Sequence, residues 1–567
     1  MALHLALEVG SLLAGYAAVD SAVRRRLVET GASAVGVGAS QVRAGIVMAT
    51  LGLSPFWTWS MVPDGAAVRW LAVALASILV WRAATRDIDI VVKDDHPWAR
   101  RVLIAATVAI PWSPAMVVGV VYLLSSPFRI WQHHATLPMR ALQALVAYLG
   151  LSALPWASVA VVPGLFADAS GLVFFILVIQ VSHYLITALA KGLLGPHWYS
   201  WVFDNKIHHL AASAYSWGWA RFIPWPHWKR IIDAVKRIER PLQGAAFAIE
   251  LLAPLALLDR RLAIAFCIGW AGFHLGVFAL SGLLFWEWVL TDLLMAAVVW
   301  HLAPDTVFGP GPTVLGTLVM VAFPLRHKLW KPMPLGWWDT PLTQRIRWEV
   351  EGESGTRYGL YNDFMCPHER LYGKVHGCFL SPRPVMTYHL GEVWKHDLRD
   401  AIRDAGPDLT RLQGVRDRFG IDPRHEGMAL RHEAYLRAFF AALDRGARKH
   451  VLPSGLRFIK APGGQLFGWG ELPAFTGQER ARRVRIFMRE EFFDGERLVR
   501  LTDELVADYD LRPSPDSASS SPPQELTPKQ IDDYLLGLAQ GRLIDLPGFG
   551  EGYANADDGV PTANPTS

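Results

Sequence analysis

The chain has 567 residues, which is too long for one ordinary soluble domain. Lysine and arginine total 55 and aspartate and glutamate total 51, so the formal net charge is +4. That balance argues against a nucleic-acid-binding protein built on a strongly basic surface. Hydrophobic residues make up 52% of the sequence and charged residues 19%, below the roughly 25% of soluble domains. Three cysteines are too few for a disulfide scaffold.

The apolar residues are concentrated in residues 1–335, and this distribution indicates an integral membrane protein with an attached soluble part. A membrane span needs about 20 largely apolar residues. Candidate spans lie at 3–22, 43–63, 66–84, 102–125, 141–165, 171–191, 242–258, 262–282, 284–302 and 311–325. We therefore expect an all-α polytopic bundle of about 8–10 transmembrane helices, in a bacterial cell membrane.

The composition changes after residue 335. Residues 336–510 alternate strand-like runs with charged helical runs, which predicts a small soluble α+β domain. Residues 511–567 contain SPDSASSSPP and an end rich in Gly, Asn, Asp and Pro, which is typical of a disordered tail.

Ionisable residues within the expected spans are candidate functional groups, because a charge in the bilayer is costly. They are His183, Lys191, Glu250, His274, Glu287 and Asp292. Structural explanations also exist. Lys191 lies at a span end and could extend its amine to the interface. His274 could bond a neighbouring carbonyl, and Glu250 could simply pair with a nearby cation.

Three segments form an ordered set within residues 100–325. They are WQHH at 131–134, YLITALAK at 184–191 followed by Trp198, and IEL at 249–251 leading through PLALL at 254–258 to FHL at 273–275. This set resembles the vitamin K-dependent γ-carboxylase superfamily, also called the horizontally transferred transmembrane (HTTM) family. Gln132-His133 stands where that family has an Asn pair, and the C-terminal part is shorter than the carboxylase's.

The resemblance implies an intramembrane cavity for a prenyl lipid. It also implies that Lys191 acts as a base toward a prenylated hydroquinone and that His134 assists carboxylation. A lysine desolvated inside a bundle can lose its proton near neutral pH, which suits a base. His274 is a third catalytic candidate, and His133, Glu250 and Trp198 are candidates for substrate binding.

A different chemistry, terpene cyclisation, is also compatible with the sequence. The chain contains 24 Trp and 26 Phe, and aromatic faces stabilise carbocations. Arg221, Lys229 and Arg230 could bind the diphosphate of a prenyl substrate. Asp94 and Asp95, in an acidic segment with two further aspartates, could hold Mg²⁺ together with substrate phosphates, although such a segment is also typical of a solvated loop.

Cys366, His368, His376 and Cys378 form a C-x-H…H-x-C pattern that could bind zinc in a tetrahedral site. The spacing is unusual for structural zinc, and a strand–turn–strand with ordinary thiols is the alternative. No P-loop, dinucleotide-binding or H-E-x-x-H motif is present.

The sequence therefore favours a membrane enzyme acting on a prenyl lipid, with terpene cyclisation of a linear prenyl diphosphate placed ahead of hydroquinone-dependent carboxylation and epoxidation. The expected partners are that lipid and the surrounding membrane, with no nucleic acid. A non-catalytic lipid-binding protein or a transporter is the alternative from another class.

Overall fold

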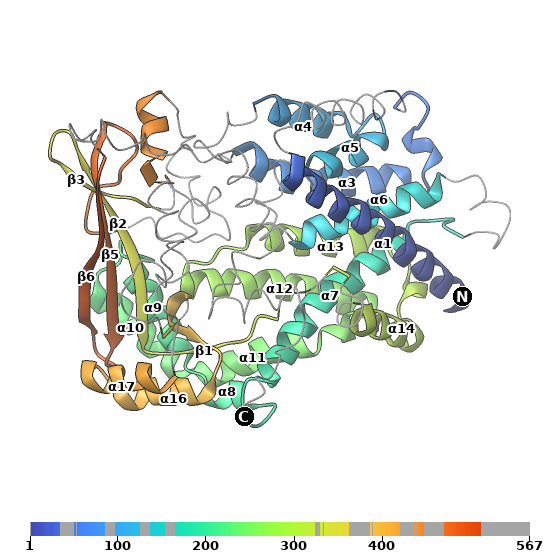
Figure 1. Ribbon diagram of the computed structural model, residues 1–567. Helices are drawn as coiled ribbons and strands as arrows, with labels where there is room; N and C mark the ends of the chain where they lie inside the picture. Colours follow the sequence, from blue (N-terminus) through green and yellow to red (C-terminus); the bar gives the residue numbers. More distant parts are fainter. Residues whose placement is uncertain are drawn as a thin grey trace.

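The computed structural model is mostly helical, with a small β-sheet region at one side (Figure 1). It describes residues 2–33, 50, 52, 54–85, 97–124, 136–153, 165–323, 329–330, 332, 334–361, 364, 386–387, 389–419, 436–437, 439–446 and 470–511. The long helices lie on the right in Figure 1, and the sheet forms the left edge.

The helical part precedes the sheet in the chain. Its helices are α1 (Ala2–Ser33), α3 (Gly65–Thr85), α4 (Pro97–Ala109), α5 (Ala115–Leu124), α6 (Thr136–Ser152), α7 (Ser170–Gly192), α8 (Ser200–Asp204), α9 (Ile207–Trp217), α10 (Trp225–Arg237), α11 (Glu239–Leu251), α12 (Arg260–Ser281), α13 (Trp286–Leu302) and α14 (Pro310–Val321). Short 3₁₀ turns are η1 (Trp59–Met61), η3 (Ala253–Leu257) and η4 (Asp305–Val307).

Helix α7 is the centre of this part. All its residues from Ser170 to Ala188 are buried, because its sequence is mostly apolar and other helices pack around it. It contacts α1, α6, α11, α13 and α14. Polar side chains join α1 to α6, where Tyr16 donates to Gln143 at 3.0 Å and Arg140 pairs with Asp20 at 3.0 Å.

Two of the described helices, α7 and α12, are long and apolar enough to cross a membrane. The sequence predicted more spans, and several of these are shorter or broken. The expected span 102–125 is interrupted between α4 and α5, where Pro111 and Pro114 lie. The expected span 242–258 ends as a helix at Leu251, and Pro254 follows in η3. Proline lacks the amide hydrogen that an α-helix interior needs, which explains both interruptions.

The sheet region follows. Its elements are β1 (Trp338–Asp339), β2 (Leu342–Gly352), β3 (Arg357–Gly359), the 3₁₀ turn η6 (His389–Gly391), β4 (Glu392–Val393), α16 (His396–Ala405), α17 (Leu409–Phe419), β5 (Ala481–Phe493) and β6 (Leu498–Asp510). The main sheet is antiparallel with strand order β3-β2-β5-β6, and β1 pairs with β4. The region shares a core with the helical part, because Trp338 and Leu342 pack in one cluster with Ala188, Trp201 and Phe247.

Side chains alternate across the main sheet, as strand geometry requires. One face carries apolar residues such as Ile346, Val484 and Met488. The opposite face carries arginines, among them Arg345, Arg347 and Arg489. Helix α9 contacts β2 and β5 (Figure 1). There, Nε1 of Trp217 donates to the hydroxyl of Thr343 on β2 at 2.8 Å. Helix α9 therefore packs against one end of this charged face.

Candidate functional site

Lys191 and Glu250 form a buried ion pair between α7 and α11. Nζ of Lys191 lies 2.7 Å from Oε1 and 2.6 Å from Oε2 of Glu250, and the two side chains are 9% and 2% exposed. The ammonium also lies 4.7 Å from the ring centroid of Trp201, which adds a cation–π interaction. Burial removes the hydrating water from both ions, which costs free energy. Close contacts between the ammonium and both carboxyl oxygens are needed to offset this cost.

A second polar group joins α7, α12 and α13. The hydroxyl of Tyr184 donates to Oδ2 of Asp292 at 2.9 Å and lies 3.0 Å from Nε2 of His274. Nε2 of Gln180 donates to the other carboxyl oxygen of Asp292 at 2.6 Å. All four side chains are buried. We call Tyr184, His274, Asp292 and Gln180 the tyrosine network.

The tyrosine network can hold one proton in either of two positions. In the first, the His274 imidazolium donates from Nε2 to the Tyr184 oxygen, and the Tyr184 hydroxyl donates to the ionised carboxyl of Asp292. In the second, a protonated Asp292 donates to the Tyr184 oxygen, and the hydroxyl donates to Nε2 of neutral His274. Moving between these states needs only short proton transfers along existing hydrogen bonds, which is the property that general acid–base catalysis uses.

Aromatic rings surround the tyrosine network. Trp270 stacks on Tyr184, with ring centroids 4.2 Å apart and an angle of 8° between the planes. Trp288 lies 5.5 Å from His274 and 6.1 Å from Tyr184. Phe285 also lies 5.5 Å from His274. Aromatic rings therefore line the surroundings of the Tyr184 and His274 side chains.

The two groups are neighbours. The Lys191 ammonium lies 5.9 Å from the ring centroid of Phe273, and the next residue in the chain is His274. Helical spacing explains how each helix contributes several groups: Gln180 and Tyr184 are four residues apart on α7, and Lys191 follows seven residues later. On α13, Trp288 and Asp292 are likewise four residues apart. The structure thus brings together Lys191, Glu250 and His274, three residues that the sequence had singled out.

Other predicted site residues lie elsewhere. Trp198 is 63% exposed and packs its ring edge-on against Tyr199. Arg221, in the turn after α9, donates to the backbone carbonyl oxygens of Tyr215 and Ser216 at 3.0 and 3.1 Å. Arg221 also lies 3.7 Å from Glu471, which pairs with Arg489 on β5.

The two remaining predicted cations lie on α10. Lys229 pairs with Asp233 at 2.7 Å and with Glu496 at 3.5 Å, so carboxylates already neutralise it. Arg230 is exposed on the same helix. The contacts of Lys229 tie α10 to the β5–β6 turn, which is not the arrangement expected of a free diphosphate-binding lysine.

Several predicted residues lie outside the described residues: His133, His134, Asp94, Asp95, Cys366, His368, His376 and Cys378. Within the ranges that the structure describes, no three His, Cys, Asp or Glu side chains are grouped as metal ligands. Cys267 is described and is a buried free thiol on α12.

A further polar group, which sequence reasoning missed, lies where the helices meet the sheet region. Asn205 and Asp339 exchange hydrogen bonds of 2.7 and 2.8 Å, and His208 contacts Glu239 at 2.6 Å. Burial raises the pKa of Asp339 to about 6, and burial lowers the pKa of His209 well below its usual range. The signal was available in the dense polar run DNKIHH at 204–209.

Comparison with known proteins gives no matching family model, no matching curated protein and no matching solved structure.

Proposed function

We propose that this chain is a multi-pass membrane enzyme, related to the vitamin K-dependent γ-carboxylase superfamily, that performs proton-transfer chemistry on a prenyl lipid. The observation that carries the proposal is the contact of the tyrosine network with aromatic rings, beside the buried Lys191–Glu250 pair. Ionisable groups in apolar helices are costly to retain, so their grouping supports a chemical role.

Terpene cyclisation is the first candidate reaction. A cyclase that starts by protonation needs an acid to add a proton to an alkene carbon, rings to stabilise the cation, and a base to remove a proton at the end. Asp292 in its protonated form supplies the acid, and Trp270 and Trp288 supply the aromatic faces. The carboxylate of Glu250 is an available proton acceptor. This route leaves the diphosphate of a prenyl substrate intact.

Hydroquinone-dependent carboxylation is the second candidate, and Lys191 is the observation that favours it. Glu250 can accept a proton from the Lys191 ammonium, because Nζ lies within 2.7 Å of both carboxyl oxygens. The neutral amine so formed is a base for a quinol hydroxyl. The two reactions differ in what they require of Lys191: carboxylation needs it to lose its proton, whereas cyclisation can proceed with it charged.

The test uses purified protein in lipid nanodiscs, supplied separately with linear prenyl diphosphates and with a reduced prenyl quinone plus bicarbonate and oxygen. Products are extracted and analysed by mass spectrometry. Cyclisation predicts that Asp292→Asn abolishes product and that Lys191→Arg retains part of the activity. Carboxylation predicts a loss of about 10²–10⁴-fold for Lys191→Ala and for Lys191→Arg.

Lys229→Gln is the matched control, because Lys229 lies on α10 and pairs with Asp233. It should leave either activity unchanged. If neither substrate is turned over by the wild-type protein, both enzymatic readings fail and the lipid-binding or transport class takes their place.

A further inference from the structure

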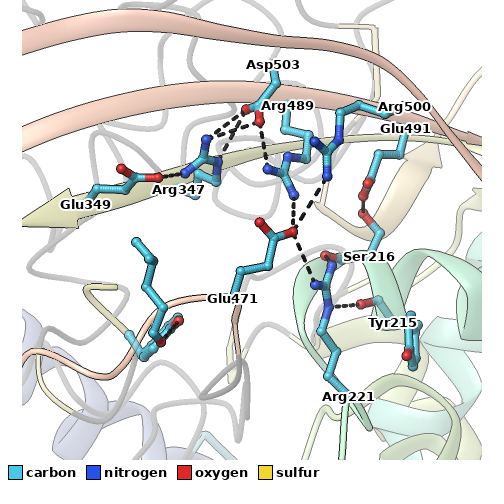
Figure 2. Close-up of polar contacts among 12 residues, drawn as sticks. Tyr215, Ser216, Arg221, Arg347, Glu349, Glu471, Arg489, Glu491, Arg500 and Asp503 are labelled. Carbon is cyan, nitrogen blue, oxygen red and sulfur yellow. Dashed lines mark hydrogen bonds and ion pairs between the residues drawn. The ribbon is translucent and has the colours of Figure 1, made fainter. Parts of the chain in front are cut away.

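The charged face of the sheet holds a second concentration of functional side chains, separate from the tyrosine network. Figure 2 shows how arginines from β2, β5, β6 and the turn after α9 converge on shared carboxylates. The arginines are Arg221, Arg345, Arg347, Arg489 and Arg500, and the carboxylates are Glu349, Glu471, Glu491 and Asp503. We call this set the arginine cluster.

Strand register creates the cluster. Arg345 on β2 is the direct partner of Arg489 on β5, and Arg489 is the direct partner of Asp503 on β6. Directly opposed residues in an antiparallel sheet point to the same face. Arg489 donates to Asp503 at 2.6 Å, and Arg347 contacts the same carboxylate at 3.1 Å. The positive charges are thus held side by side by the sheet itself.

Positive charge exceeds negative charge in this cluster. Its five guanidinium groups face four carboxylates, and one of these, Glu349, also pairs with Arg357. Nε of Arg345 and Nε of Arg489 are buried and have no hydrogen-bond partner among the described residues. Burial and the adjacent arginines lower the pKa of Arg345 to about 9, although Glu491 opposes this effect. Among the described residues, this cluster therefore has one guanidinium group more than it has carboxylates.

Glu471 occupies the position that an anion bound by these arginines would take. Its carboxylate oxygen lies 3.0 Å from Arg489, 3.6 Å from Arg500 and 3.7 Å from Arg221. Figure 2 shows the three guanidinium groups pointing at this one carboxylate. The side chain of Glu471 is 57% exposed, so it can leave the arginines without opening a core.

The cluster lies beside the end of a candidate membrane span. Trp219, two residues before Arg221, donates from Nε1 to the carbonyl oxygen of Ala279 in the last turn of α12. Its indole also lies against Gly282, which ends that helix with a φ of +74°. A Cβ added by substitution of this glycine would lie 2.8 Å from the ring. The end of a span lies at the level of lipid head groups, and α12 is also the helix that carries His274.

We propose that the arginine cluster binds a phosphoryl group of a phosphate monoester or diphosphate, with Glu471 displaced from Arg221, Arg489 and Arg500 by the incoming oxygens. Arginine suits this role because its planar group of N–H donors matches phosphate oxygens in bidentate contacts. The phosphoryl group is either the head group of a membrane lipid or a free phosphate compound. The proposal concerns binding alone, so it stands or falls separately from the proposed chemistry.

The experiment measures binding to the full chain in two arms. In the first, inorganic pyrophosphate is titrated by calorimetry into protein in phosphatidylcholine nanodiscs. In the second, native mass spectrometry measures the retention of phosphatidic acid against phosphatidylcholine. Glu471→Gln removes the competing carboxylate and should tighten binding about tenfold, and Arg345→Gln should weaken it about tenfold, as expected for charge-assisted hydrogen bonds.

Arg483→Gln is the matched control, because Arg483 lies on β5 and pairs with Asp508 on β6 at the far end of the hairpin. Binding of pyrophosphate alone identifies a soluble phosphate compound, and binding of phosphatidic acid alone identifies a lipid head group. The proposal is wrong if neither probe binds wild-type protein or Glu471→Gln, or if Glu471→Gln binds no more tightly than Arg483→Gln. Because Glu471 is exposed, this comparison is valid even if Arg345→Gln fails to fold.

Discussion

The Lys191–Glu250 pair in the bundle and the arginine cluster on the sheet compensate buried charges in different ways. In the bundle, one cation and one carboxylate satisfy each other completely. On the sheet, Asp503 is shared by Arg347 and Arg489, and Glu471 is shared by three arginines. When one member of an isolated ion pair is removed, the other is left buried without a counter-ion. In a network, a carboxylate that loses one arginine still contacts another. A single pair such as Lys191–Glu250 suits a site where one proton must move. A network of shared partners such as the arginine cluster suits a site where one anion replaces another.

The largest effect should follow from breaking the isolated pair. Lys191→Met leaves the Glu250 carboxylate buried without its cation, and such breakage costs about 3–5 kcal/mol of unfolding free energy. The double variant Lys191→Met/Glu250→Leu removes both charges and should recover most of that stability, while under the proposed function turnover stays lost. Thermal unfolding in detergent measures the first effect, and product analysis measures the second. A double variant as unstable as the single one would show that the pair contributes packing rather than charge.

Asp339 lies where the two regions meet, and it offers a test by pH. Its pKa is about 6 in the folded protein because of burial, against an ordinary value of 3.8. Between these values the folded state keeps a proton that the unfolded chain has released. The free energy of unfolding therefore falls as pH rises through this window, by about 3 kcal/mol in total.

Asp339→Asn cannot ionise, so its stability relative to wild type should be most favourable above about pH 6 and should shrink toward about pH 4. Unfolding curves of the two proteins at several pH values check this. A difference that is constant with pH, or that grows in acid, would mean that Asp339 is not buried at the junction.

Arg489→Met tests the network directly and should cost less than Lys191→Met, although Arg489 is only 2% exposed. Asp503 retains Arg347 and Glu471 retains Arg221, so no carboxylate is left alone. We expect a loss of roughly 1–3 kcal/mol, the range for removing one partner of a buried hydrogen bond. A loss as large as that of Lys191→Met would contradict the redundancy of the cluster.

The sequence predicted the bundle site better than the sheet cluster, for a physical reason. The apolar run 171–191 matches α7, and the run 262–282 matches α12 within two residues. Lys191 and Asp292 are easily recognised in the sequence, because each is a charged residue within a long apolar segment. The partner of Asp292 was less visible, because the sequence does not show that the Tyr184 hydroxyl lies 2.9 Å from Asp292.

The arginine cluster could not be read from the sequence in the same way. Arginine is ordinary in a soluble region, and nothing local distinguishes Arg345 from Arg483. The cluster depends on register between β2, β5 and β6 and on a turn that lies more than a hundred residues earlier in the chain. The prolines within the expected spans 102–125 and 242–258 are visible in the sequence, and the helices are interrupted at these prolines.

Lys229 gives the smallest expected effect and the sharpest contrast with Arg221. Both were predicted to bind a diphosphate, yet Lys229 pairs with Asp233 one turn away at 2.7 Å, whereas Arg221 lies 3.7 Å from the displaceable Glu471. An i,i+4 pair is worth about 0.2–0.5 kcal/mol, so Lys229→Gln should barely change thermal stability. It should also leave pyrophosphate binding unchanged, while Arg221→Gln weakens it. If Lys229→Gln weakened binding as much as Arg221→Gln, the phosphoryl site would lie on α10, and the arginine cluster would be only a structural network.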